Sequence, residues 1–212
     1  VSDQLSKTGQ TPLQRLQALG LLTPRFMAVH MTQLDQQQIT EFAATGAHLV
    51  HCPESNLKLA SGFCPVAACL DAGINVALGT DGSASNNDLD MLGEMRTAAL
   101  LAKAVSGNAA AVSAAQALRM ATLNGAKVLG LDHEIGSLAI GKAADVVAVD
   151  ISGIESQPLF NPLSHLVYSA TRQQISDVWI AGKQLLKERQ LTHLNLQDLQ
   201  QRIAGWQQKL QS

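Results

Sequence analysis

The sequence is poor in aromatic residues and charged residues. Aromatic side chains make up 3% of the 212 residues and charged side chains 15%, whereas 46% are hydrophobic, so the chain can form a buried core. Lys and Arg total 15 against 17 Asp and Glu, which gives a formal net charge of −2. This balance gives no electrostatic reason to expect nucleic acid or an anionic membrane as a partner.

Long hydrophobic runs and paired cysteines are also missing. No apolar run reaches the roughly 18 residues of a membrane-spanning helix, and residues 1–4 show neither the basic nor the apolar part of a signal peptide. The three cysteines, Cys52, Cys64 and Cys69, form no CxxC motif. We therefore expect reduced thiols in a cytoplasmic protein. Because the first residue is Val rather than Met, we also expect the chain to begin inside a longer protein.

Strand and helix patterns alternate over the first 130 residues. Short apolar stretches at 26–30, 47–51 and 74–79 have the length and composition of buried strands. Capping residues and apolar periodicity predict helices at 35–45, 65–73, 89–104 and 113–129. Strands that alternate with helices across short loops indicate parallel βα units, either half of a (β/α)8 barrel or part of an open doubly wound sheet.

The pattern changes after Gly130. Residues 136–142 have the composition of a turn-rich pair of strands, 144–150 that of a buried strand, and 176–186 that of a hairpin around Ala181 and Gly182. From Asn195 onward, apolar residues recur at spacings of three and four, at Leu196, Leu199, Ile203, Trp206 and Leu210. This spacing predicts an amphipathic helix that covers another part of the protein.

Three polar residues stand at the carboxyl ends of the predicted strands: His30, His51 and Asp81. Barrels and open parallel sheets place their active sites at this edge. Two imidazoles and a carboxylate can hold a cation such as Zn²⁺, Fe²⁺ or Mn²⁺, or orient its bound water. Each residue also has a structural explanation: the histidines as core residues bonded to the backbone, and Asp81, before Gly82, as an ordinary turn residue.

Longer segments around these residues resemble a known family. HCPESNLKLASG at 51–62 resembles the HxPxSNxKLxSG segment of the amidohydrolase superfamily, in its branch of cytosine deaminases and chlorohydrolases. LGTDGSASNNDLDM at 78–91 resembles the LGTDGAASNNxLDM segment of that branch, and 94–103 and 136–150 continue the similarity. The resemblance covers essentially the whole chain. Within the branch it points to the 5′-methylthioadenosine/S-adenosylhomocysteine deaminases.

The resemblance implies an α/β fold, a (β/α)8 barrel with a small β-sandwich built from both chain ends. Residues 1–130 would form the C-terminal half of the barrel, 131–190 part of the sandwich, and 191–212 a C-terminal amphipathic helix. The first strands and most substrate-binding residues would lie upstream of Val1, in the N-terminal half of the same protein. Family members are commonly dimers or larger, so we expect a homo-oligomer.

The resemblance also implies roles for individual residues. The family binds one divalent metal ion, usually zinc, through an HxH pair on the first strand, a histidine on the fifth and an aspartate on the eighth. His30 and Asp81 resemble the fifth-strand and eighth-strand ligands, and Asp81 would also accept a proton. His51 resembles the sixth-strand histidine that contacts the metal-bound hydroxide or the substrate. Ser55, Asn56 and Asn86 are implied as supporting or loop-shaping groups.

Two departures from the family pattern bear on activity. The 212 residues contain no HxH, so we expect the chain alone to be inactive. In the family, the fifth-strand motif is usually HxxE, whose glutamate moves protons, and the segment that resembles it here is His30-Met31-Thr32-Gln33. A neutral amide is neither a general acid nor a general base. Gln33 could still hydrogen-bond a ring nitrogen of the substrate, and proton transfer would pass to Asp81 and His51.

The function implied by the resemblance is metal-dependent hydrolytic deamination of a small-molecule, adenosine-type substrate with release of ammonia. Two alternatives stay open. A related amidohydrolase would act on guanine, 8-oxoguanine, a chlorotriazine or a cyclic amide. A degenerate relative would serve as a non-catalytic binding or assembly subunit; Gln33 and the missing HxH favour this reading, whereas the intact segment around Asp81 disfavours it.

Overall fold

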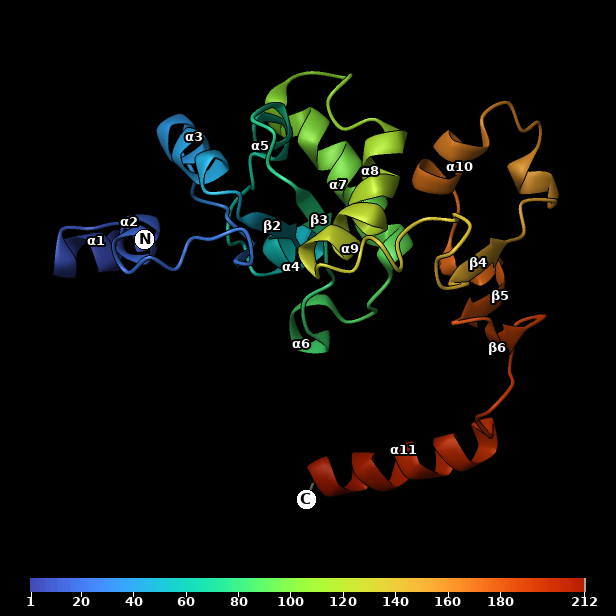
Figure 1. The fold of residues 1–212 in the computed structure, drawn as a ribbon. Helices are drawn as coiled ribbons and strands as arrows, with labels where there is room; N and C mark the ends of the chain where they lie inside the picture. The colour runs from blue at the N-terminus through green and yellow to red at the C-terminus, as the bar shows by residue number, and fades with distance from the viewer. Residues whose placement is uncertain (212) are drawn as a thin grey trace.

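The computed structural model describes residues 1–211 and contains two separate sheets (Figure 1). The first is parallel, with strand order β1 (Met27–Val29), β2 (His48–His51) and β3 (Val76–Leu78). The second is antiparallel, with order β4 (Val146–Val149), β5 (Ile175–Ile180), β6 (Lys183–Lys187) and β7 (Gln190–Leu191). The C-terminal helix α11 (Leu196–Gln211) lies apart from both sheets in Figure 1. The three parallel strands confirm the expected βα organisation.

The parallel sheet forms the centre of the main core. Met27 pairs with His48, and Leu49 pairs with Val76. Leu49 and Val76 are fully buried, together with Ile39 and Phe42 of the helix α3 (Gln36–Ala44). Because the three strands run the same way, the residues after β1, β2 and β3 all lie at one edge of the sheet.

Local capping explains where the main helices begin. Asp35 accepts the backbone N–H of Gln38 at 2.8 Å, which confirms the helix start expected at residue 35, and the Asp35 backbone N–H donates to the Gln38 side-chain oxygen at 3.0 Å. Asp90 caps α7 (Met91–Ser106), and Pro65 is the N-cap of α5 (Val66–Asp71) rather than part of its first turn.

Figure 1 shows α7 beside α8 (Ala114–Ala121). These helices pack against each other and against β3.

The single helix expected at 113–129 is wrong in one respect: it breaks at Thr122 into α8 and α9 (Leu123–Val128). The Thr122 backbone leaves the helical region, with φ −128° and ψ −93°. Beyond the break, Asn124 donates to the carbonyl of Val76 at 2.8 Å, and its own carbonyl accepts from Asn75 at 3.1 Å. The break therefore brings Asn124 onto the end of the parallel sheet.

The second half departs further from expectation. The strand pair expected at 136–142 is absent from the described chain: this segment is a loop, in which Lys142 donates to the Ile135 carbonyl at 3.1 Å. Among the described residues no strand pairs with this segment, and Ile140 is fully exposed. β4 forms as expected but is not buried, since Val147 is 56% exposed. The hairpin of β5 and β6 is confirmed, with Ala181 and Gly182 both at positive φ.

Several short helices complete the fold. The remaining α-helices are α1 (Ser2–Thr8), α2 (Pro12–Ala18), α4 (Pro53–Lys58), α6 (Ser83–Asn86) and α10 (Pro162–Tyr168), with 3-10 turns at Ile154–Ser156 and Arg172–Gln174. The helices at 53–58 and 83–86 were not among those expected from the sequence. α10 packs on α7 and α8 and buries Val167. No helix of the described chain is both long and apolar enough to cross a bilayer.

The C-terminal helix is confirmed, but its expected packing is not. All five apolar residues of its stripe are exposed, from Leu199 at 38% to Leu210 at 83%. α11 therefore covers no part of the described chain. The spacing of apolar residues determines a helix locally, whereas the surface it covers depends on contacts with distant residues.

Candidate active site

His30 and Asp81 meet at the carboxyl edge of the parallel sheet. His30 directly follows β1, and Asp81 comes three residues after the end of β3. The distance from His30 Nε2 to Asp81 Oδ2 is 3.9 Å. Both residues have positive φ, 73° and 61°, a region that non-glycine residues rarely occupy. Backbone strain of this kind is often retained where it aims functional side chains.

Two consecutive residues of α4 orient this pair. Asn56 Oδ1 lies 2.8 Å from His30 Nδ1, and Ser55 Oγ donates to Asp81 Oδ2 at 2.7 Å. This bond fixes the orientation of the imidazole ring, with Nδ1 toward Asn56 and Nε2 on the side of Asp81. Ser55 and Asn56 are both buried, at 0% and 2% exposure, which fixes these contacts.

Hydrogen bonds keep Asp81 ionised. The Ser55 hydroxyl lowers the pKa of the Asp81 carboxyl most, and the Ser85 hydroxyl, at 2.8 Å from Oδ2, and the Gly82 backbone N–H lower it further. All of these donors favour the charged form. The result is an anionic oxygen that faces the imidazole Nε2 of His30.

His51 stands at the same edge but is inaccessible. It is the last residue of β2 and is 1% exposed. Burial and, to a smaller extent, the nearby His30 lower its pKa to about 4, so the ring is neutral at pH 7. Its Nδ1 has no hydrogen-bond partner among the residues described. Buried polar atoms of this kind usually have a partner, so the nitrogen is available to a group outside these residues.

The sheet corrects the strand numbers assigned above. β1 pairs directly with β2 and β2 with β3, and no strand lies between those of His51 and Asp81. If Asp81 follows the eighth strand of a barrel, His51 ends the seventh and His30 follows the sixth. His30 therefore does not stand on a fifth strand, and Gln33 does not occupy the position of the fifth-strand glutamate. The numbering implied by the resemblance placed a seventh strand between His51 and Asp81, whereas in the described chain β2 and β3 are direct neighbours.

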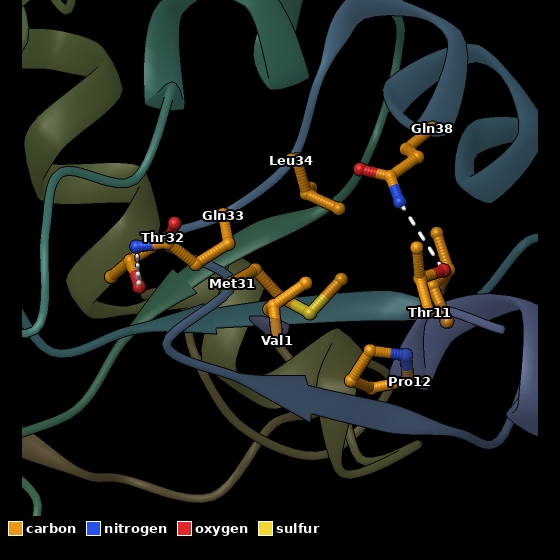
Figure 2. Close-up of a pocket in the computed structure, with 9 residues that line it drawn as sticks. Val1, Thr11, Pro12, Met31, Thr32, Gln33, Leu34 and Gln38 are labelled. Atoms are coloured by element: carbon orange, nitrogen blue, oxygen red, sulfur yellow. Dashed lines mark hydrogen bonds between the residues drawn. The ribbon is translucent and has the colours of Figure 1, made fainter. Parts of the chain in front are cut away.

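Gln33 lies beside this pair without touching it. Its amide donates to the Ser61 carbonyl at 3.2 Å and, more weakly, to Thr32 Oγ1; among the described residues it has no bond to His30 or Asp81. It lines a pocket of about 210 Å³ with Met31 and Thr32. Figure 2 shows Gln33 and Thr32 at one end of this pocket and Thr11 and Pro12 at the other.

The described residues do not by themselves complete a metal site. No group of three or more His, Cys, Asp or Glu side chains among them is arranged to hold an ion. Asn86, expected near the site, is 8% exposed and bonds Glu94 and the backbone of Leu89 instead of Asp81. Sequence analysis missed the contact of Ser85 with Asp81, although Ser85 lies inside the segment 78–91 that carries the resemblance.

Comparisons with known proteins identify the family. Residues 2–185 match the model of the amidohydrolase family. The chain is 51% identical over 210 residues to the 5-methylthioadenosine/S-adenosylhomocysteine deaminase of Teredinibacter turnerae, covering 99% of this chain and 48% of that protein. It is 48% identical over 212 residues to the deaminase of the same name from Saccharophagus degradans, again covering 48% of that protein. The chain thus spans about half the length of the curated relatives it matches.

Solved structures give the same picture. An adenosine deaminase from Xanthomonas campestris with bound zinc superposes with a TM-score of 0.97 at 52% identity, covering 100% of this chain and 48% of that one. An atrazine chlorohydrolase from Arthrobacter aurescens complexed with zinc gives a TM-score of 0.89 at 29% identity, covering 95% and 45%. The expected α/β class, part of a (β/α)8 barrel with a small sheet and a C-terminal helix, is confirmed.

Proposed function

Because this chain belongs to the amidohydrolase family, we propose that it forms part of a metal-dependent hydrolase that deaminates adenosine-type nucleosides and releases ammonia. 5′-Methylthioadenosine and S-adenosylhomocysteine are the proposed substrates, in keeping with the names of the relatives. The observation that carries the proposal is the His30–Asp81 pair, 3.9 Å apart and held by Ser55 and Asn56.

The donor atoms of this pair fit a divalent cation. Zinc bonds to imidazole nitrogen and to carboxylate oxygen are each about 2.0–2.2 Å long, so an ion held by His30 Nε2 and the Asp81 carboxylate suits the separation of the two side chains. We propose zinc, with Fe²⁺ or Mn²⁺ suited to the same donors. A bound ion of this kind lowers the pKa of water toward about 7, which supplies hydroxide at neutral pH. The remaining ligands would come from the N-terminal half of the same protein.

We assign a separate role in the reaction to each of the three residues at the sheet edge. Asp81 Oδ2 already accepts two hydroxyl hydrogen bonds, so we assign Oδ1 to accept the proton from the attacking water and pass it to the departing amine. His30, held by Asn56, presents the lone pair of Nε2 either as a ligand or, as its place on the sixth strand suggests, toward the attacking water. For His51 we propose a contact with the water or substrate through a ring nitrogen, in the neutral state that burial imposes.

Variants of the full-length protein test these assignments. We expect Asp81→Asn to lower turnover of 5′-methylthioadenosine by about 10³-fold or more and to reduce the zinc content, because the anionic oxygen is lost. Metal analysis of His30→Ala separates its two roles: a ligand loses zinc with activity, whereas a water contact loses activity alone. Stoichiometric zinc and normal turnover in both variants would show the assignment to be wrong.

Gln33→Glu provides a comparison in the same assay. We expect this variant to retain or raise deaminase activity, because Gln33 is exposed and bonds only loop atoms. A collapse of activity would show that the amide contacts the substrate.

Ammonia release from guanine and 8-oxoguanine, and hydrolysis of a chlorotriazine and a cyclic amide, tests the other substrates open to this family. We further propose that the protein is cytoplasmic, in keeping with the three free, buried cysteines, and that it forms a homo-oligomer, as the family resemblance implies.

A further inference from the structure

A buried carboxylate without a basic partner lies behind the proposed site. Glu94 of α7 is 0% exposed. Its hydrogen bonds come from the Asn86 side-chain amide, 2.6 Å from Oε1, and from the Glu54 backbone N–H, 3.3 Å from Oε2. No Lys or Arg among the described residues forms an ion pair with it. Burying a carboxylate in this way costs free energy, so its retention calls for an explanation.

A second carboxylate shares the same amide. Glu54 Oε2 lies 3.4 Å from Asn86 Nδ2, and Glu54 Oε1 accepts from Thr97 Oγ1 at 2.9 Å. We call Glu54, Asn86, Glu94 and Thr97 the acid cluster. It joins α4, α6 and α7, three elements that are separate in the sequence. Burial and, to a smaller extent, the charge of Glu54 raise the pKa of Glu94 to about 7, in keeping with two acids that share one environment.

The acid cluster is directly connected to the residues that orient the site. Glu54 precedes Ser55 and Asn56, which bond Asp81 and His30. On the other side, Asn86 Oδ1 accepts the backbone N–H of Leu89 at 2.7 Å. The segment 81–89 contains three non-glycine residues at positive φ: Asp81, Asn87 and Leu89. Such a backbone persists only where other contacts hold it in place.

We propose that Glu94 is a positioning residue: through Asn86 and the Glu54 backbone it fixes α4 against the segment 81–89, and so sets the separation of His30 and Asp81. Neither Glu94 nor Thr97 contacts these two residues; they act through Ser55, Asn56 and Asn86. The inference rests on the proposed function of the same site, but its structural part, order in the segment 81–89, can be measured without turnover.

The test uses full-length Glu94→Ala and the pair Thr97→Val and Thr97→Ser. In Glu94→Ala we expect hydrogen exchange of the backbone amides of 81–89 to rise by about tenfold or more. We also expect kcat on 5′-methylthioadenosine to fall by about 10²-fold, with KM changed less than about threefold, because a small displacement of reacting groups is costly. Thr97→Val should show the same effects more weakly, and Thr97→Ser, which keeps the hydroxyl, should restore both readouts.

Met95→Ala is the matched control. Met95 lies next to Glu94 on the same helix and is 3% exposed, but belongs to the apolar core rather than to the acid cluster. It should lower thermal stability while leaving kcat and the exchange of 81–89 within about twofold, since packing loss alone does not displace the site. If Glu94→Ala behaves like Met95→Ala, or changes neither readout, the proposal is wrong.

Two further results of these experiments are informative. If Glu94→Ala does not fold, the two Thr97 variants decide, because both keep a side chain of nearly the same size. If the wild-type enzyme deaminates no nucleoside but exchange of 81–89 still rises in Glu94→Ala and in Thr97→Val, the positioning role stands and the proposed substrate class fails.

Discussion

At the residue scale, burial rather than net charge sets the protonation states around the site. His51 is nearly inaccessible and its pKa is lowered to about 4, whereas burial raises the pKa of the Cys52 thiol to about 12. Both side chains are therefore neutral at pH 7. Asp81, at the exposed edge, is held in the charged state by hydroxyl groups instead. One small region thus keeps adjacent side chains in different states of charge.

The buried imidazole of His51 predicts a pH dependence of stability. Its pKa is lower in the folded state than its ordinary 6.5, so stability is present above pH 6.5 and is lost as the pH falls toward 4. We expect the advantage of the metal-free wild type over His51→Asn to shrink by about 2 kcal/mol between pH 7.5 and pH 5, measured by urea unfolding.

Comparing the wild type with His51→Asn removes the pH dependence that other groups give to the free energy of unfolding. Glu94 acts in the opposite sense, because its raised pKa gives stability below pH 4.5 that is lost as the pH rises through about 7. Since Glu94 is present in both proteins, its effect drops out of the difference. A difference independent of pH would mean that His51 is not desolvated in solution.

At the scale of single elements, capping groups decide where helices start. Asp35 and Gln38 exchange two bonds at the start of α3, which buries Ile39 and Phe42 against the parallel sheet. The same arrangement, with Ser113 and Gln116, starts α8. These helices need only local contacts to begin correctly, which is why their first residues are readable from the sequence.

Removing the cap of α3 should destabilise the protein measurably. We expect Asp35→Ala to lower the free energy of unfolding by about 1 kcal/mol, whereas Asp35→Gly should cost only a few tenths of that, since glycine tolerates the N-cap backbone. Urea unfolding of both variants, with exposed Gln36→Ala as the control, checks the prediction. Equal losses in Asp35→Gly and Asp35→Ala would contradict it.

At the scale of the whole molecule, large apolar side chains remain uncovered. Phe160 is 90% exposed, Ile154 87% and Ile140 108%, and the stripe of α11 is exposed along its length. Exposed apolar surface of this extent is typical of regions that contact other protein surfaces. The chain spans about half the length of its curated relatives, and these exposed faces are consistent with a larger folded unit.

Metal binding should therefore depend on the rest of the protein. After dialysis we expect the 212-residue chain to retain less than about 0.1 zinc per molecule, and the full-length protein about one, because structural and catalytic zinc sites need at least three protein ligands. Elemental analysis of both proteins makes the comparison, with Asp81→Asn as the control for zinc bound elsewhere. Stoichiometric zinc in the chain alone would contradict the proposed division of ligands.

The sequence alone determined the features that depend on neighbouring residues. The three apolar stretches became the parallel strands, Ala181 and Gly182 became a hairpin turn, and His30, His51 and Asp81 were recognised at strand ends. Strand composition, turn conformation and capping all act within a few residues, so a single sequence reports them. The family resemblance added the expectation of a metal-dependent hydrolase.

Only the tertiary structure decided which of these residues meet. Strand order placed His30 next to His51 and corrected the numbering of the strands, and the short helix α4 brought Ser55 and Asn56 onto Asp81 and His30. The break at Thr122, the burial of His51 and the exposure of α11 likewise depend on contacts between distant segments. Such contacts follow from sheet register and packing across the whole fold, which no local pattern of residues encodes.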